Sequence, residues 1–115
     1  MIRKIIFYKN YFLDFYNQQA EDVQEKIDYV LDLISNVERV PTKFLAYLED
    51  TDGLYEVRVK VGSNIYRIFC FFDEGKLVVL INGFQKKAEK TPKNELKKAS
   101  KIKEDYFKNK EEGEL

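Results

Sequence analysis

The chain has 115 residues, of which 44% are hydrophobic and 35% charged, and its 20 basic residues balance its 20 acidic ones. This length suits one domain with a single hydrophobic core, and the absence of histidine excludes His-based triads and His-ligated metal sites. No apolar run approaches the about 20 residues of a transmembrane helix, and residues 1–12 lack the apolar core of a signal peptide, so we expect a cytoplasmic protein.

The first half of the sequence predicts a strand followed by two helices. Residues 2–8 form a short β-branched run typical of a strand. A short helix is expected from about residue 11, with an aromatic stripe. A second helix is expected at about residues 20–35, where apolar side chains recur with helical spacing and acidic ones occupy the other side. We expect this helical hairpin to pack on a sheet, so that its apolar stripe is core.

Residues 54–84 predict three consecutive antiparallel strands. The first strand alternates apolar and charged side chains, which is typical of a half-buried strand. Gly62 and Ser63 follow, and they suit a two-residue hairpin turn with glycine at the first central position. With this turn, Val61 pairs with Asn64, and Arg58 lies directly opposite Arg67.

Two arginines side by side on one face of a sheet call for an explanation, because like charges in this position are destabilising. In one interpretation Glu56, diagonal to Arg67, neutralises the pair at the surface. In the other, both guanidinium groups bind a phosphate bidentately. Lys60 adds a cation to this face. Ile65, Phe69 and Phe71 are expected to supply an apolar surface for a base. The pairing depends on the turn, because a one-residue slip in register would place the two arginines on opposite faces.

The second half of the chain is rich in basic residues. Residues 57–110 contain 14 basic and 6 acidic residues, whereas residues 14–56 contain 3 basic and 11 acidic ones. This division makes the second half a candidate surface for a polyanion, although lysines that coat a solvated helix would look the same. After a third strand ending at Phe84, a final helix is expected up to about residue 107, with Tyr106 on its inner side. Residues 111–115 are expected to be a polar tail.

The predicted order is βααβββα, an α+β fold in one domain spanning residues 1–110, with the helices packed on one face of an antiparallel sheet. Such packing leaves the arginine face at least partly open. The lone Cys70 lies among apolar residues, and we expect a buried, inert thiol.

Three segments, LYEVRVKVGSNIYRIFCFF, VVLINGFQKKAEKTP and ELKKA, resemble the RelE/HigB toxins of the RelE/ParE superfamily, in particular its phage-derived Gp49-like branch. The resemblance covers nearly the whole chain. It implies a RelE-like fold and the toxin component of a type II toxin–antitoxin module. Most such toxins are mRNA endoribonucleases (mRNA interferases) that act on the ribosome and inhibit translation, whereas the ParE branch inhibits DNA gyrase with the same fold.

The resemblance implies catalytic roles for Arg58, Arg67, Lys86 and Lys87. The reaction would be RNA cleavage without metal or cofactor, leaving a 2′,3′-cyclic phosphate, with the arginines stabilising charge and Lys86 as the first candidate for proton transfer. Relatives with a catalytic His or Tyr near the C-terminus differ from this chain, which suggests strong dependence on the ribosome. Residues expected to contact RNA phosphates are Lys60, Lys90, Lys93, Lys97 and Lys101.

The partners implied are mRNA, the ribosome and an antitoxin that carries a helix-turn-helix and covers the basic face. Promoter DNA would be bound only through that antitoxin, and no membrane is involved. Two alternatives stay open: a ParE-like gyrase inhibitor, and a non-enzymatic member whose main partner is the antitoxin.

Overall fold

The computed structural model describes residues 1–87 and 89–115 and contains a five-stranded sheet with three helices. Ala88 lies outside the described residues. The strands are β1 (Lys4–Phe7), β2 (Leu45–Tyr47), β3 (Tyr55–Val61), β4 (Asn64–Asp73) and β5 (Leu77–Lys86). The helices are α1 (Tyr11–Asn17), α2 (Glu21–Asn36) and α3 (Lys93–Glu111). The α+β class is confirmed. None of the helices in the described part of the chain is both long and apolar enough to span a membrane.

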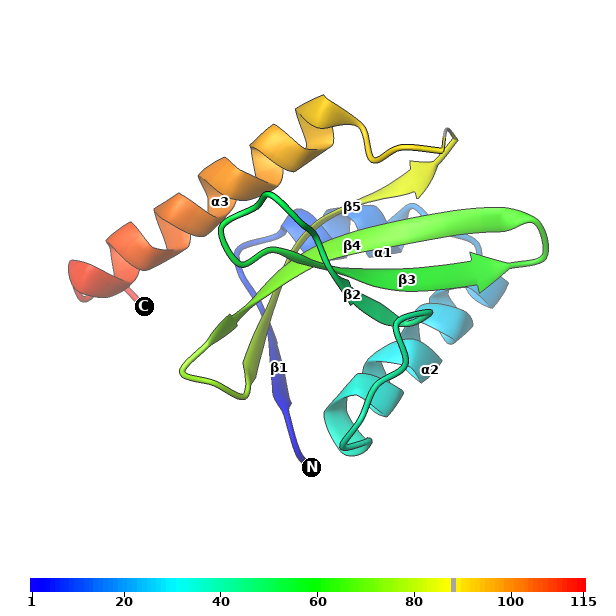
Figure 1. Ribbon diagram of the computed structural model, residues 1–115, viewed down its shortest axis with the longest axis horizontal. Helices are drawn as coiled ribbons and strands as arrows, with labels where there is room; N and C mark the ends of the chain where they lie inside the picture. Colours follow the sequence, from blue (N-terminus) through cyan, green and yellow to red (C-terminus); the bar gives the residue numbers. More distant parts are fainter. Residues whose placement is uncertain (88) are drawn as a thin grey trace.

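The sheet has the strand order β1-β5-β4-β3-β2 (Figure 1). The three central strands form the predicted antiparallel meander. Two features at the edges differ from the prediction. β1 pairs with β5 in parallel, and the three-residue β2 adds an antiparallel edge strand beside β3. A strand as short as β2 carries too little alternation to be recognised from its residues alone.

The helical hairpin α1–α2 packs on one face of the sheet, as predicted. Val23, Ile27, Val30 and Ile34 of α2 are buried against Val57, Val59 and Ile68, among other strand residues. These helix positions are separated by four, three and four residues, which places them on one stripe. Burial of this stripe removes its apolar surface from water.

Helix α3 packs on the opposite face, so the expectation that the helices share one face was wrong. Ala99, Ile102 and Tyr106 of α3 contact the side of the sheet that carries Phe69 and Phe71. Figure 1 shows α3 and α2 on opposite sides of the strands. The physical reason lies in the meander, where both faces of β4 and β5 are apolar and each therefore needs a cover. α3 also extends to Glu111, one turn beyond the predicted end.

A β-bulge interrupts the pairing of β4 and β5. Cys70 pairs with Leu80 and Ile68 with Gly83, so that two residues of β5, Ile81 and Asn82, oppose the single Phe69. The extra residue reverses the side-chain alternation in the last part of β5. As a result, Phe84 and Lys86 lie on the same face as Arg67 and Ile65, their partners in β4.

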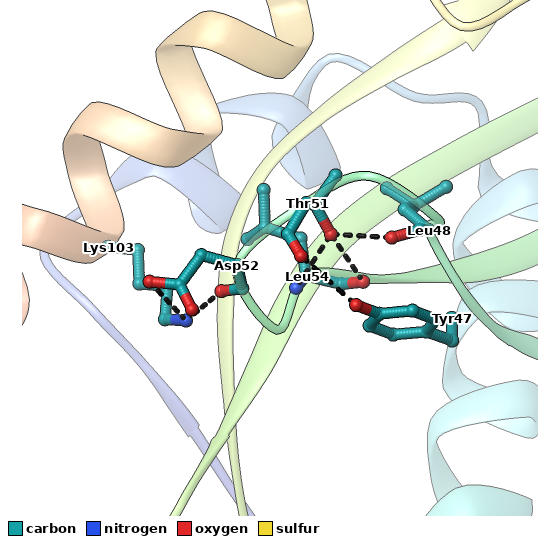
Figure 2. A network of polar contacts seen from close by, with 6 residues as sticks. All are labelled: Tyr47, Leu48, Thr51, Asp52, Leu54 and Lys103. Carbon is teal, nitrogen blue, oxygen red and sulfur yellow. Dashed lines mark hydrogen bonds and ion pairs between the residues drawn. The ribbon is translucent and has the colours of Figure 1, made fainter.

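The loop between β2 and β3 is held by Thr51. Its Oγ1 donates to the carbonyl oxygen of Leu48 at 2.6 Å and accepts from the backbone N–H of Leu54 at 3.1 Å. Figure 2 shows this arrangement together with Lys103, whose ammonium donates to the carbonyl oxygen of Asp52. The loop is therefore closed on itself and fastened to α3.

Candidate nucleic-acid interface

The hairpin between β3 and β4 determines which side chains form the site. Gly62 adopts a φ of 61°, which glycine tolerates without a steric penalty. Val61 pairs with Asn64, and the register places Arg58 opposite Arg67. The predicted turn, its register and the pairing of the two arginines are therefore confirmed.

Glu56 lies between the two arginines as a buried carboxylate. Its Oε1 is 3.0 Å from Nε of Arg58 and 3.3 Å from Nε of Arg67, and the side chain is 3% exposed. Its Oε2 has no hydrogen-bond partner among the described residues. Neutralisation by Glu56 thus occurs, but below the surface and with one negative charge for two positive ones. The buried carboxylate accepts a hydrogen bond from Arg58, attracts Arg67 by charge alone, and leaves the pair a net positive charge.

The two arginines differ in exposure and in their further contacts. Arg67 is 12% exposed and Arg58 35%. Burial lowers the pKa of Arg67, Glu56 opposes this effect, and the nearby Arg58 cation adds to it. A guanidinium stays protonated under such conditions, so Arg67 remains a cation in a partly desolvated position. Arg58 also donates through Nη1 to the carbonyl oxygen of Thr42 at 3.2 Å, which restricts its orientation.

A groove of about 210 Å³ opens over the arginine pair; we call it the arginine groove. It is lined by Lys43, Arg58, Val59, Lys60, Ile65 and Arg67. Four of these six residues are cationic. Lys43 was not anticipated, because it reaches the groove only through the pairing of β2 with β3, and its local sequence carries no signal of that pairing.

A second hollow of about 520 Å³, lined by Ile65, Lys86, Lys87 and Glu89, adjoins the first one. Both are lined by Ile65, so the basic surface is continuous from Arg58 to Lys86. Lys86 pairs with Ile65 across β5 and β4 on the arginine face, and Lys87 is exposed just beyond the strand. The lysines expected beside the arginine pair are therefore at its border.

The aromatic surface expected beside the arginines is not available. Phe69 and Phe71 are fully buried, because α3 covers that part of the face. Ile65 is the apolar residue that remains at the groove. A base could rest against its side chain, but stacking on Phe69 or Phe71 is excluded.

The lysines expected to contact RNA are distributed over two surfaces. Lys60 lines the arginine groove. Lys97 and Lys101 line a different groove on α3, and Lys90 and Lys93 are exposed where the helix begins. All five lysines are exposed, but they do not lie in one site.

The side chains of Cys70 and Tyr106 are buried, as predicted. Cys70 is fully buried, and burial raises the pKa of its thiol. Tyr106 is 5% exposed and donates to Asp73 Oδ2 at 2.8 Å, and burial raises its pKa to about 12. In the described part of the chain, no three His, Cys, Asp or Glu residues are arranged to hold a metal ion.

Comparison with known proteins agrees with this fold. A family model described as "Phage derived protein Gp49-like (DUF891)" matches residues 14–104. The crystal structure of the archaeal RelE–RelB complex from Pyrococcus horikoshii OT3 contains a similar chain, with a TM-score of 0.53 and 20% sequence identity; the match covers 72% of this chain and 93% of that one. No curated protein matches significantly. The fold is therefore RelE-like, and the chain belongs to the phage-derived Gp49-like family.

Proposed function

We propose that the protein is the toxin of a type II toxin–antitoxin module and acts as an mRNA endoribonuclease that inhibits translation. The observation that carries this proposal is the arginine pair. Two guanidinium groups, ion-paired with one buried carboxylate, border an open groove that contains two further cations. Such a cluster suits a phosphodiester, whose non-bridging oxygens accept the paired N–H donors of arginine.

The proposed reaction is an internal transesterification. The ribose 2′-oxygen attacks the adjacent phosphorus while the bond to the 5′-oxygen breaks, which gives a 2′,3′-cyclic phosphate and a free 5′-hydroxyl. Arg58 and Arg67 stabilise the additional negative charge on the phosphoryl oxygens, and one preorganised donor of this kind contributes about 10²–10³ in rate. The proton of the 2′-hydroxyl is removed and the 5′-oxygen receives one. No metal or cofactor is needed for these steps.

Lys86 is the first candidate for a proton transfer, and Lys87 for a contact with the substrate. Both border the arginine groove through Ile65. Tyr106 points into the core and binds Asp73, so it is withdrawn from the reaction. With so few groups available for acid–base chemistry, we propose that the ribosome orients the mRNA for attack. In the cytoplasm this positioning would account for much of the rate.

The partner we propose is an antitoxin with a helix-turn-helix that covers the basic face. The similar chain from Pyrococcus horikoshii is described in a complex with RelB. An antitoxin seated on the arginine groove would exclude RNA, and the complex would bind promoter DNA through the antitoxin. The groove is cationic, so the segment that fills it should be acidic.

Expression of the chain in bacteria tests the proposal. The wild type should stop protein synthesis and leave mRNA cut inside reading frames. Arg67→Ala should abolish both effects, and so should Arg58→Ala, which changes a more exposed side chain and is therefore less disruptive to folding. Arg39→Ala removes an exposed arginine outside the groove and should stay toxic.

Two outcomes would contradict the proposal. Folded Arg58→Ala and Arg67→Ala proteins that remain fully toxic would remove the arginine pair from the mechanism. Double-strand DNA breaks with an SOS response, and intact mRNA, would identify a gyrase inhibitor instead. Circular dichroism of each purified variant reports whether it is folded.

A further inference from the structure

A second basic groove of about 490 Å³ runs along α3 on the side away from the β2–β3 loop. We call it the lysine groove. Among the residues that line it are Tyr11, Asn94, Lys97, Lys98, Lys101 and Asp105. Tyr11 comes from the start of α1 and the others from α3. The groove is therefore built by two elements that are distant in sequence and fixed by the core.

The three lysines of this groove are available for a ligand. Lys97, Lys98 and Lys101 are exposed, and within residues 1–87 and 89–115 none of them forms an ion pair. Lys98 lies over the Tyr11 ring, 5.9 Å from its centroid, which keeps its stem against the wall of the groove. The lysines thus present ammonium groups that the protein itself does not neutralise.

Asp105 is the acidic residue of this groove, and its carboxylate is already hydrogen-bonded to other residues of the protein. Its Oδ2 accepts from Tyr8 Oη at 2.5 Å and from Lys9 Nζ at 2.8 Å. These two hydrogen bonds hold the pKa of the Asp105 carboxyl below its usual value, and the bond from Lys9 has the larger effect. Lys9 therefore neutralises this carboxylate, which does not cancel the charge of the three lysines.

The remaining polar groups favour an anion with several acceptor oxygens. Lysine offers only donors, and Asn94 and Tyr11 add an amide and a hydroxyl that can donate. Lys97 and Lys101 are one helical turn apart, so their side chains are neighbours along the groove. A linear chain of phosphates meets this pattern better than a single small anion, because it can contact successive lysines at once.

The lysine groove begins at the N-terminal end of α3, the end that follows β5 along the chain. β5 ends at Lys86, and α3 begins at Lys93 after a short connection. Asn82 of the bulge also donates to the carbonyl oxygen of Glu95, at 3.3 Å, which fixes the first turn of α3 to β5. An RNA strand that leaves the arginine groove over Lys86 and Lys87 would therefore reach the first turns of α3, where the lysine groove begins.

We propose that the lysine groove binds the phosphodiester backbone of single-stranded RNA beyond the nucleotides that are cut. This inference rests on the proposed function for the identity of the ligand, but it concerns binding and not cleavage. The groove would hold the message in one direction across the protein. Its contribution is electrostatic, so it should weaken steeply with salt.

Fluorescence anisotropy with 5′-labelled 2′-O-methyl RNA, which resists 2′-hydroxyl attack, tests the proposal. Oligonucleotides of three and twelve nucleotides are titrated with the full chain over a series of KCl concentrations. Lys97→Gln/Lys101→Gln should weaken the twelve-nucleotide complex roughly tenfold and lower the slope of log K against log [KCl] by about 1.4, since each phosphate contact to a single strand contributes about 0.7. Binding of the three-nucleotide RNA should change little.

The matched control is Lys76→Gln/Lys108→Gln, which removes the same charge from two exposed lysines outside both grooves. An equal loss in this control would overturn the proposal, because net charge alone would then explain the effect. Unchanged binding of the long RNA by Lys97→Gln/Lys101→Gln would overturn it as well. If Arg58→Ala proves toxic while the groove variant still loses RNA affinity, the nuclease proposal fails and the lysine groove stands.

Discussion

Arg58 and Arg67 are both ion-paired with a single carboxylate oxygen, Oε1 of Glu56. Nε of Arg58 donates to this oxygen at 3.0 Å, whereas Nε of Arg67 lies 3.3 Å from it without forming a hydrogen bond. A carboxylate between two like charges on a sheet offsets part of their repulsion, and its hydrogen bond with Arg58 orients that guanidinium group. The second oxygen of Glu56 has no hydrogen-bond partner among the described residues. A buried acceptor without a partner costs about 1–3 kcal/mol. The fold tolerates this cost at the place where the arginines are held in position.

Glu56→Gln should therefore lower both stability and activity. The amide keeps the shape of the side chain but leaves two cations uncompensated near the interior. We expect a loss of about 1–3 kcal/mol in the free energy of unfolding, below the value for a fully buried pair because Arg58 is partly exposed. Urea unfolding measures the stability, and cleavage of mRNA on ribosomes measures the activity.

Glu49→Gln is the matched control for this change, since it removes the same charge at an exposed position close in sequence. It should leave both quantities unaltered. A Glu56→Gln protein with wild-type cleavage would show that the ion pairing of the arginines with this carboxylate is not required.

Lys86 and Lys87 should respond differently to substitution. Lys86 lies on the arginine face opposite Ile65, whereas Lys87 follows the strand and is exposed. If Lys86 transfers a proton, Lys86→Gln should lower the cleavage rate on ribosomes by about 10²–10⁴. Lys87→Gln should have a much smaller effect. Equal losses in the two variants would assign both lysines to electrostatic binding only.

Gly83→Ala should destabilise the fold, because β5 approaches α1 closely at this position. A Cβ added to Gly83 would lie 2.6 Å from Cδ2 of Phe15, within the core. Overpacking of this kind costs about 1–3 kcal/mol. Phe15→Leu should relieve part of the clash, so the double variant should lose less than the sum of the two single losses in urea unfolding. Additive losses would argue against this contact as the cause.

Asp73 should make stability depend on pH in the acidic range. Burial alone would raise its pKa, but hydrogen bonds from Lys110 at 2.9 and 2.8 Å and from Tyr106 hold the pKa below its usual value. The folded pKa is lower than the unfolded one, so the stabilisation is complete above about pH 4 and is lost as the pH falls below that value.

Urea unfolding of the wild type and of Asp73→Asn, carried out at several pH values, checks this expectation. The difference between the two proteins should be constant near neutral pH and should shrink below about pH 4. Asp50→Asn, at an exposed position, is the control and should show no such trend. A difference that persists unchanged at pH 2 would contradict the assigned role of Asp73.

The sequence predicted the elements whose signals are local. The Gly62-Ser63 turn determines the register of β3 and β4 by itself, and the apolar stripes of α2 and α3 determine which sides of these helices are buried. The pairing of Arg58 with Arg67 follows from this register. The likeness to the Gp49-like family, confirmed by the match over residues 14–104, was carried by the same segments.

Features that depend on distant contacts could not be predicted. The parallel pairing of β1, the short β2 and the position of Lys43 all arise from tertiary pairing. The burial of Phe69 and Phe71 depends on where α3 lies, which their alternation in β4 does not reveal. The bulge in β5 was also missed, although Asn82-Gly83 stands at it and a glycine inside a strand is a known signal of a bulge.

That bulge has a consequence for any attempt to redesign the protein. In an uninterrupted ladder from Leu80 and Cys70 onward, Gln85 would stand opposite Ile65, and the ammonium of Lys86 would be turned toward the helical hairpin. A redesign that made β5 regular would therefore keep the same set of charges but remove Lys86 from the proposed site. The bulge is what places Lys86 of β5 on the same face of the sheet as Arg67 of β4.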